Sequence, residues 1–196
     1  GTLTREETTA AFTDQAVFTH PGRGVDGYTE SKMNPAGSYM DMQWFSWTQI
    51  YPFIRGANLA ILKLTENEAG FDSSFTNRLL GEAYFMRGYF YSQLMRQYGG
   101  VVLTLSPFAL EDEAANPRAS FEQTVNQIIS DIDQSITLLA DAPVNKSRAH
   151  KITALALKAR VLTHAASDLY EPSKNSSIST IAGYSNKELV SYTSGS

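Results

Sequence analysis

The sequence predicts an all-α protein in which antiparallel helix pairs stack side by side, as in tetratricopeptide-like (TPR-like) scaffolds. Apolar residues recur at helical spacing in five segments, and several of these segments begin with residues that cap helices. The one extended run, Val101 to Leu105, is too short to imply a sheet. Stacked helix pairs bury a shared core between neighbours, which accounts for this pattern even though the TPR consensus itself is absent.

The first two predicted helices span residues 3–17 and 48–65. Thr4 and Glu7 match a capping box at the start of the first helix. Pro52 falls in the first turn of the second helix, where proline is tolerated. The apolar positions of the second helix are Ile50, Ile54, Ala57, Ile61 and Leu64.

The third predicted helix, residues 74–98, is the longest, and Gly99-Gly100 provides its C-terminal stop. Its apolar face is predicted to comprise Leu79, Ala83, Phe90 and Leu94. Gly88 lies inside this helix, where glycine costs about 1 kcal/mol of helix preference.

The fourth predicted helix, residues 121–139, has the clearest period, and Ser120 with Gln123 forms a second capping box. Its apolar stripe is Phe121, Val125, Ile128, Ile132, Ile136 and Leu139. The fifth helix is expected over residues 151–169, and its many alanines would let a neighbouring helix approach closely. The residues it is expected to bury are Ile152, Leu155, Ala159, Leu162, Ala166 and Leu169.

The amino-acid composition argues against several classes of function and of site. The net charge of -4 and the pI of about 5.4 argue against nucleic-acid binding. With no cysteine, the chain has no disulfide, cysteine-type zinc site, thiol nucleophile or lipid-bearing cysteine of its own. No stretch of 18 apolar residues is present, so no segment is predicted to span a membrane. No cofactor and no metal site are predicted.

Two regions are expected along the chain. Residues 1–170 form the helical region, which includes a long loop at residues 20–47 that is rich in glycine, proline and aromatic residues. Loops of this length usually have a function in compact domains. Residues 171–196 contain many serines and little apolar periodicity, which predicts a mobile segment of a truncated chain.

Three stretches resemble the SusD/RagB family. The first runs from Tyr51 to Asn58 and ends in an alanine-asparagine pair, and the most specific runs from Gly81 to Val101. The third joins Arg118-Ala119-Ser120 to residues 128–132, and then Arg148-Ala149 to residues 154–160. Together they cover roughly residues 50–165 in family-like order. The sequence departs from the family at Val102, where proline is frequent, and at Gly88, where alanine is usual.

The resemblance implies a surface-exposed lipoprotein of a Gram-negative outer membrane that binds a nutrient and does not catalyse a reaction. Family members pass oligosaccharides, or peptides in some cases, to a SusC-like TonB-dependent transporter. They are much longer than this chain, so the chain is expected to be an N-terminal fragment whose lipid anchor lies elsewhere.

The aromatic loop offers the candidate ligand residues, which are Tyr28, Tyr39, Asp41, Trp44 and Trp47. A sugar presents a C–H face that stacks on an aromatic ring, while its hydroxyl groups need polar partners. The alternative is that these rings only pack the loop onto the second helix, because aromatic residues dominate core packing.

Three polar residues are predicted to be structural. Arg87 falls on the apolar stripe of the third helix, and a buried arginine needs a partner. Glu82 is poorly placed for it within the same helix, so we expect a carboxylate or carbonyl groups from another helix. Asn58 borders Ile54 and Ile61 and is expected to bond to backbone.

Two other function classes are considered. A helical-repeat module that binds a protein would fit the same helix pattern. A helical enzyme acting on glycans would need two carboxylates flanking a cleft, and no such pair can be nominated. The GxGxxG match at residues 22–27 follows Pro21 and a helix rather than a strand, so it does not predict nucleotide binding.

Overall fold

The computed structural model describes residues 14–15, 17, 46–107, 116–142, 147–171, 174 and 184–193. These residues form α-helices and short 3₁₀-helices, with no strand among them. The α-helices are α2 (Trp47–Glu66), α3 (Ser73–Tyr98), α4 (Phe121–Leu138) and α5 (Lys151–Ala165). The 3₁₀-helices are η3 (Asp168–Tyr170) and η4 (Lys187–Leu189). The prediction of an all-α fold is confirmed.

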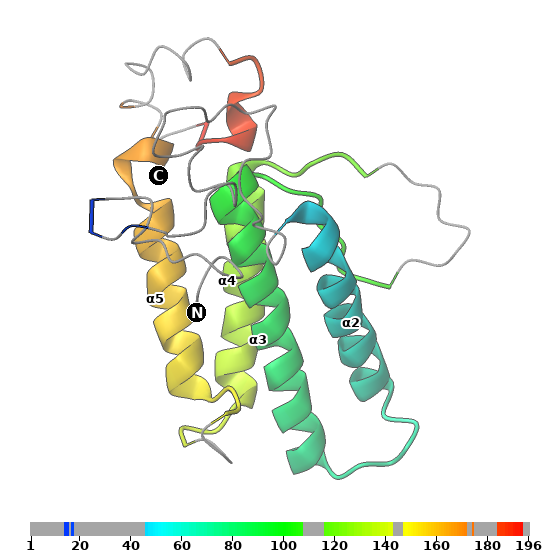
Figure 1. Cartoon of the computed structure of the whole chain (residues 1–196). Helices are drawn as coiled ribbons and strands as arrows, with labels where there is room; N and C mark the ends of the chain where they lie inside the picture. The colour runs from blue at the N-terminus through cyan, green and yellow to red at the C-terminus, as the bar shows by residue number, and fades with distance from the viewer. Residues whose placement is uncertain are drawn as a thin grey trace. The chain divides into compact units, whose positions relative to one another are not determined.

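The chain divides into two compact units, residues 1–51 and 52–196. The second unit holds α2 from Pro52 onward together with α3, α4 and α5; these lie side by side in that order, and each runs antiparallel to its neighbour (Figure 1). This is the stacked antiparallel arrangement that the sequence predicts.

Local signals set the helix ends. Asp72 caps α3 by accepting a hydrogen bond from the backbone N–H of Phe75 at 3.0 Å. Ser120 and Gln123 form the predicted capping box of α4, with N···O distances of 3.0 and 2.9 Å. Gly99 ends α3 with φ of 73°, a left-handed conformation that glycine adopts at little cost.

Glycines let α3 and α4 pack closely. A Cβ added at Gly81 would lie 2.8 Å from Cγ of Leu139, and one at Gly88 would lie 3.2 Å from Cγ1 of Ile132. Both glycines, seven residues apart, therefore face α4. Glycine at position 88 lowers the helix preference of α3, but it allows α4 to approach closely.

Gly100 has a second structural role beyond the stop signal. A Cβ there would lie 2.1 Å from the carbonyl oxygen of Ala119, so only glycine fits without a backbone shift. Its N–H donates to the carbonyl oxygen of Leu189 at 2.6 Å, which ties the end of α3 to η4. Tyr192, just after η4, contacts the Phe121 ring edge-on at 5.2 Å between centroids. The predicted mobility of residues 171–196 stays a prediction.

The stripe predicted on α4 is confirmed as the centre of the core. Phe121, Ile128 and Ile132 are fully buried, and Val125 and Leu139 are less than a tenth exposed. Ile136 is partly exposed near the end of the helix. On α2, Ile50, Ile54 and Ala57 are buried, again as predicted.

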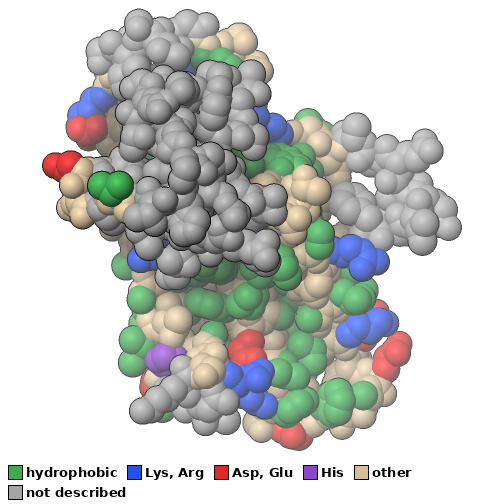
Figure 2. All heavy atoms as spheres, in the orientation of Figure 1, with side chains coloured by type: hydrophobic (Ala, Val, Ile, Leu, Met, Phe, Trp, Pro, Cys, Tyr) green, Lys and Arg blue, Asp and Glu red, His purple; other side chains and the backbone are tan. Residues whose placement is uncertain are grey.

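The prediction of which face of α5 is buried is wrong. Ile152 is 61% exposed and Leu155 47%, while the buried residues are Ala154, Leu157, Val161 and Ala165. Hydrophobic side chains accordingly gather along the outer edge of α5 (Figure 2). The physical reason is that α5 carries two apolar stripes, and the stripe rich in small residues is the one that packs on α4. The helix also ends at Ala165, four residues earlier than predicted.

The apolar face predicted on α3 is incomplete. Ala83 and Leu94 are buried, but so are Gly81, Arg87, Gly88, Tyr91 and Met95. Because α3 lies between α2 and α4, it buries residues on two sides. Most of the predicted first helix, residues 3–17, lies outside the described residues. At its end Asp14 and Gln15 form a turn and Val17 is 90% exposed without regular structure, so the helix does not reach Val17.

Candidate functional site

Trp47 is the one predicted ligand residue that lies among the described residues; Tyr28, Tyr39, Asp41 and Trp44 lie outside them. It is the first residue of α2 and is partly buried. Its ring is tilted by 43° against that of Tyr51, one helical turn later, with 5.0 Å between centroids. The pair places a partly accessible aromatic ring where the loop enters the helix, so packing and ligand binding are both compatible with this position.

Arg87 of α3 lies in the core, 5% exposed, and forms a two-point ion pair with Asp131 of α4. Its Nε donates to Oδ2 at 2.8 Å and its Nη2 to Oδ1 at 2.6 Å, which is the geometry in which arginine binds carboxylates most strongly. Burial opposes the charge on Arg87, but the hydrogen bonds and attraction to Asp131 raise its pKa overall. The partner is therefore a carboxylate from another helix.

Asn58 of α2 extends this contact to the segment that follows α3. Its Nδ2 donates to the carbonyl oxygen of Thr104 at 2.8 Å, and its Oδ1 accepts from Nη1 of Arg87 at 2.9 Å. Arg87 also donates to the carbonyl oxygen of Leu105 at 3.2 Å. The phenol of Tyr91 accepts from the N–H of Thr104 at 2.7 Å, and burial raises its pKa. Hydrogen bonds of Arg87 thus join α3 to α4 and to α2, and both α2 and α3 are hydrogen-bonded to residues 104–105.

Glu82 does not pair with Arg87. It accepts a hydrogen bond from Nε of Arg148 at 2.7 Å, and the other carboxylate oxygen accepts from Nη2 of the same residue. The hydrogen bond to Glu82 raises the pKa of Arg148. This pair joins α3 to the segment before α5.

Sequence reasoning missed two residues of these contacts. Asp131 lies between Ile128 and Ile132 on the stripe of α4, so the argument that singled out Arg87 could have found it. Arg118 donates to the carbonyl oxygens of Tyr98 and Gly100, at 2.5 and 2.8 Å, and so satisfies the end of α3. No local pattern pairs Arg118 with residues some twenty positions away. That Arg87, Glu82 and Asn58 act as structural pins stays a prediction.

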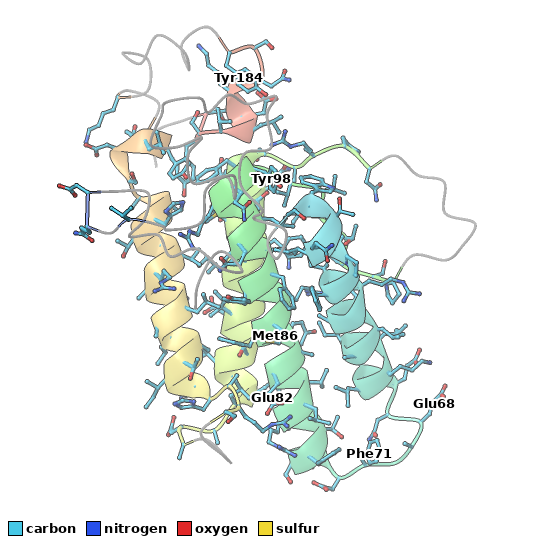
Figure 3. The ribbon with its side chains drawn as sticks, in the orientation of Figure 1. Glu68, Phe71, Glu82, Met86, Tyr98 and Tyr184 are labelled. Atoms are coloured by element: carbon cyan, nitrogen blue, oxygen red, sulfur yellow. The ribbon has the colours of Figure 1, made fainter. Side chains whose placement is uncertain are left out.

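The buried ion pair does not line the cavities that described residues form. One of about 410 Å³ lies between α2 and α3, lined by Phe53, Ala57, Ala60, Leu64, Leu79, Glu82, Ala83, Met86 and Phe90. Glu82 and Met86, which line it, are labelled in Figure 3. Another, of about 450 Å³, lies at the start of α3 and includes Arg78 and His150. Trp47, Arg87 and Asp131 line neither of them.

Among the described residues, no three or more histidine, cysteine or acidic side chains lie together in a way that could hold a metal ion. The described part of the chain also contains no helix that is long and apolar enough to cross a membrane.

Comparison with known proteins gives one consistent family. The SusD-like family model, described as starch-binding and associating with the outer membrane, matches residues 7–162. A SusD-like protein of Formosa agariphila, P38, is 32% identical over 141 residues, which are 71% of this chain and 26% of that protein.

Solved structures agree with this match. A SusD-like protein from Bacteroides fragilis is 28% identical and superposes with a TM-score of 0.57, covering 71% of this chain and 26% of its own. A laminarin-binding SusD-like protein is 25% identical with a TM-score of 0.62, over 73% of this chain and 30% of its own. The chain thus spans about a quarter to a third of the length of these relatives.

Proposed function

This chain belongs to the SusD-like family, and on that premise we propose that it takes part in reversible glycan binding at the outer membrane, without catalysis. The observation that carries the proposal is the match of the starch-binding family model to residues 7–162, together with a relative that binds laminarin. A binding role needs a preformed surface rather than a set of reacting groups. The buried Arg87–Asp131 pair is hydrogen-bonded between α3 and α4, and this arrangement is compatible with a scaffold.

The ligand site is proposed to include the aromatic loop, through Tyr28, Tyr39, Asp41, Trp44 and Trp47. Trp47 supports this, because its ring is partly accessible and is held by Tyr51 at the start of α2. An aromatic ring fixed before binding loses little side-chain freedom when a sugar stacks on it.

The place and partner of this binding are proposals as well. The protein would lie on the outer face of a Gram-negative outer membrane, held by an N-terminal lipid anchor outside this chain. It would pass its oligosaccharide, or a peptide, to a SusC-like TonB-dependent transporter. Purification of the tagged protein from its native membrane is expected to retain such a transporter, and its absence from the purified material would contradict the partnership.

Calorimetry with two neutral glucans tests the binding site. The probes are laminarihexaose and maltoheptaose, which represent the laminarin of the relative and the starch of the family description. Trp44→Ala or Trp47→Ala is expected to weaken binding about fivefold or more, because a few aromatic anchors dominate most binding sites.

Phe71→Ala is the matched control, since Phe71 is 50% exposed in the turn between α2 and α3. It should leave the affinity unchanged. Unchanged affinity in both tryptophan variants would remove the loop from the site. Release of reducing sugar from either probe would contradict the non-catalytic role.

A second candidate, a helical module that binds another protein, is favoured by the apolar outer face of α5. It predicts that no glycan binds and that substitutions on this face abolish a protein contact. Glycan binding that depends on Trp47 would count against it.

A further inference from the structure

A separate cavity of about 360 Å³ lies at the C-terminal end of α3, where η3 and the residues around η4 meet it. Its lining residues are Met95, Arg96, Gln97, Tyr98, Gly99, Leu169, Tyr170, Tyr184 and Val190. The labelled Tyr98 and Tyr184 lie at this end of the second unit in Figure 3. The volume is within the range of small-ligand sites, about 300–1,000 Å³, and at its lower end, which suits one or two sugar rings.

Tyr170 is a fixed aromatic wall of this cavity. It is 7% exposed, and one ring face stacks on Phe121 with 4.3 Å between centroids and 14° between planes. Its phenol oxygen lies 2.9 Å from Nε2 of His164, which holds the ring in its plane. Tyr184 on the lining is 39% exposed, so it offers accessible aromatic surface. An accessible ring such as that of Tyr184 can accept the C–H face of a sugar, while the buried Tyr170 closes the cavity behind it.

Arg96 gives the cavity its charge, because it is the one charged side chain among the described lining residues. It is exposed, and its Nη1 donates a hydrogen bond to Oε1 of Gln93 at 3.4 Å, while the described residues place no carboxylate in an ion pair with it. Burial lowers the pKa of His164, and the positive charge of Arg96 lowers it further. Burial raises the pKa of Tyr170, and the same charge opposes that rise. The charge of Arg96 thus acts on the pKa of both His164 and the wall residue Tyr170.

From these features we propose that the cavity binds one ring of an anionic saccharide. The accessible ring of Tyr184 contacts the C–H face, and Arg96 binds the carboxylate of a uronic acid or a sulfate ester, while Gln97 supplies a polar neighbour. This rests on the proposed glycan-binding function and adds to it a second subsite, away from the aromatic loop in sequence, that selects for charge. Guanidinium groups suit both anions because their fork of N–H donors matches two oxygen atoms.

The test is calorimetry on the intact protein with three trisaccharides of galactose type: trigalacturonate, a sulfated galactan trisaccharide and neutral galactotriose. An anionic probe is expected to bind, with affinity that falls as salt rises, and Arg96→Ala should weaken it about tenfold, the loss typical of a charged hydrogen bond. Binding of one anionic probe alone identifies carboxylate or sulfate as the group recognised. Arg96→Gln removes the charge but keeps a polar side chain, and it should show the same loss, while Tyr184→Ala should weaken binding of the same probe. Circular dichroism checks that each variant is folded.

Arg160→Ala is the matched control, because Arg160 is an exposed arginine of α5 that does not line the cavity. Unchanged affinity in folded Arg96→Ala and Arg96→Gln, or equal affinity for galactotriose and the anionic probes, would overturn the subsite. So would binding of neutral glucans with no binding of either anionic probe. Loss of neutral glucan binding in Trp47→Ala with anionic binding retained would support two separate sites. Failure of the wild-type protein to bind any neutral or anionic saccharide would overturn the proposed function and the subsite together.

Discussion

The helices α4 and α5 are neighbours in sequence and in space, yet the core-facing side of α4 can be read from its sequence and that of α5 cannot. On α4, isoleucine, valine and phenylalanine form a single stripe, and this stripe is buried. On α5, the large residues Ile152, Leu155 and Leu162 face outward, and alanines with Leu157 and Val161 face α4. Side-chain size alone therefore does not predict which face of a helix is buried when the helix has two apolar faces.

The difference follows from what each helix contacts. α4 lies between α3 and α5 and must fill the space on both sides, so large side chains are used there. α5 approaches α4 through a face that includes two alanines, which reduces the space between them, and leaves the larger Ile152, Leu155 and Leu162 exposed. An outward apolar stripe with this spacing is typical of a helix that packs against something on each side.

The largest expected loss of stability comes from breaking the buried ion pair between α3 and α4. Asp131→Ala removes the partner of Arg87 and leaves a buried guanidinium without a carboxylate, which should lower the free energy of unfolding by about 3–5 kcal/mol. Urea denaturation measures this loss. Asp133→Ala on the same helix is the control, because Asp133 is about half exposed and pairs with Lys158 of α5 at 2.6 Å. Asp133→Ala should lower the free energy of unfolding by about 1 kcal/mol or less. Equal decreases in the two variants would contradict the contrast between the buried and the exposed ion pair.

Truncating one large residue on each helix tests the comparison directly. Ile132→Ala on α4 creates a cavity at a fully buried position and should cost about 2–5 kcal/mol. Leu162→Ala on α5 removes a side chain that is 45% exposed and should change stability by about 0.5 kcal/mol or less. Both are measured by urea denaturation of the 196-residue chain. A large loss in Leu162→Ala would mean that the outer face of α5 is covered in the folded chain.

Enlarging alanines separates the two faces of α5. Ala154 is fully buried toward the core, so Ala154→Leu should overpack the contact and cost about 1–3 kcal/mol. Ala159 is exposed, and Ala159→Leu is expected to be close to neutral in thermal unfolding. A stabilised Ala154→Leu would show that α4 and α5 leave unfilled space between them.

The smallest expected effect is the pH dependence from His164 in the last turn of α5. Burial and then the charge of Arg96 hold its pKa below the ordinary value of about 6.5. The folded state therefore binds the proton less readily than the unfolded state, so this contribution to stability is present above about pH 6.5 and is lost as pH falls through the lowered pKa. The melting temperature should fall less between about pH 7.5 and 5.5 in His164→Gln than in the wild type. Identical falls would exclude His164 as the source.

Part of the fold and of the candidate site follows from local sequence alone. Capping residues and Gly99 set helix ends, because they act on backbone groups within four residues. The need for a carboxylate beside Arg87 follows from the cost of burying a charge. The choice of Asp131, and the use of Arg118 to satisfy the end of α3, depend on contacts between distant positions that no local period encodes.

Periodicity and capping are local properties, so the helical class, most of the helix ends and the single stripe of α4 follow from the amino-acid sequence. Helix packing, in contrast, selects the buried stripe of α5, pairs Asp131 with Arg87 and turns Gly81 and Gly88 toward α4. The physical reason is that these outcomes depend on how closely two helices can approach. That distance is set by the side chains of both partners together, and neither helix specifies it alone.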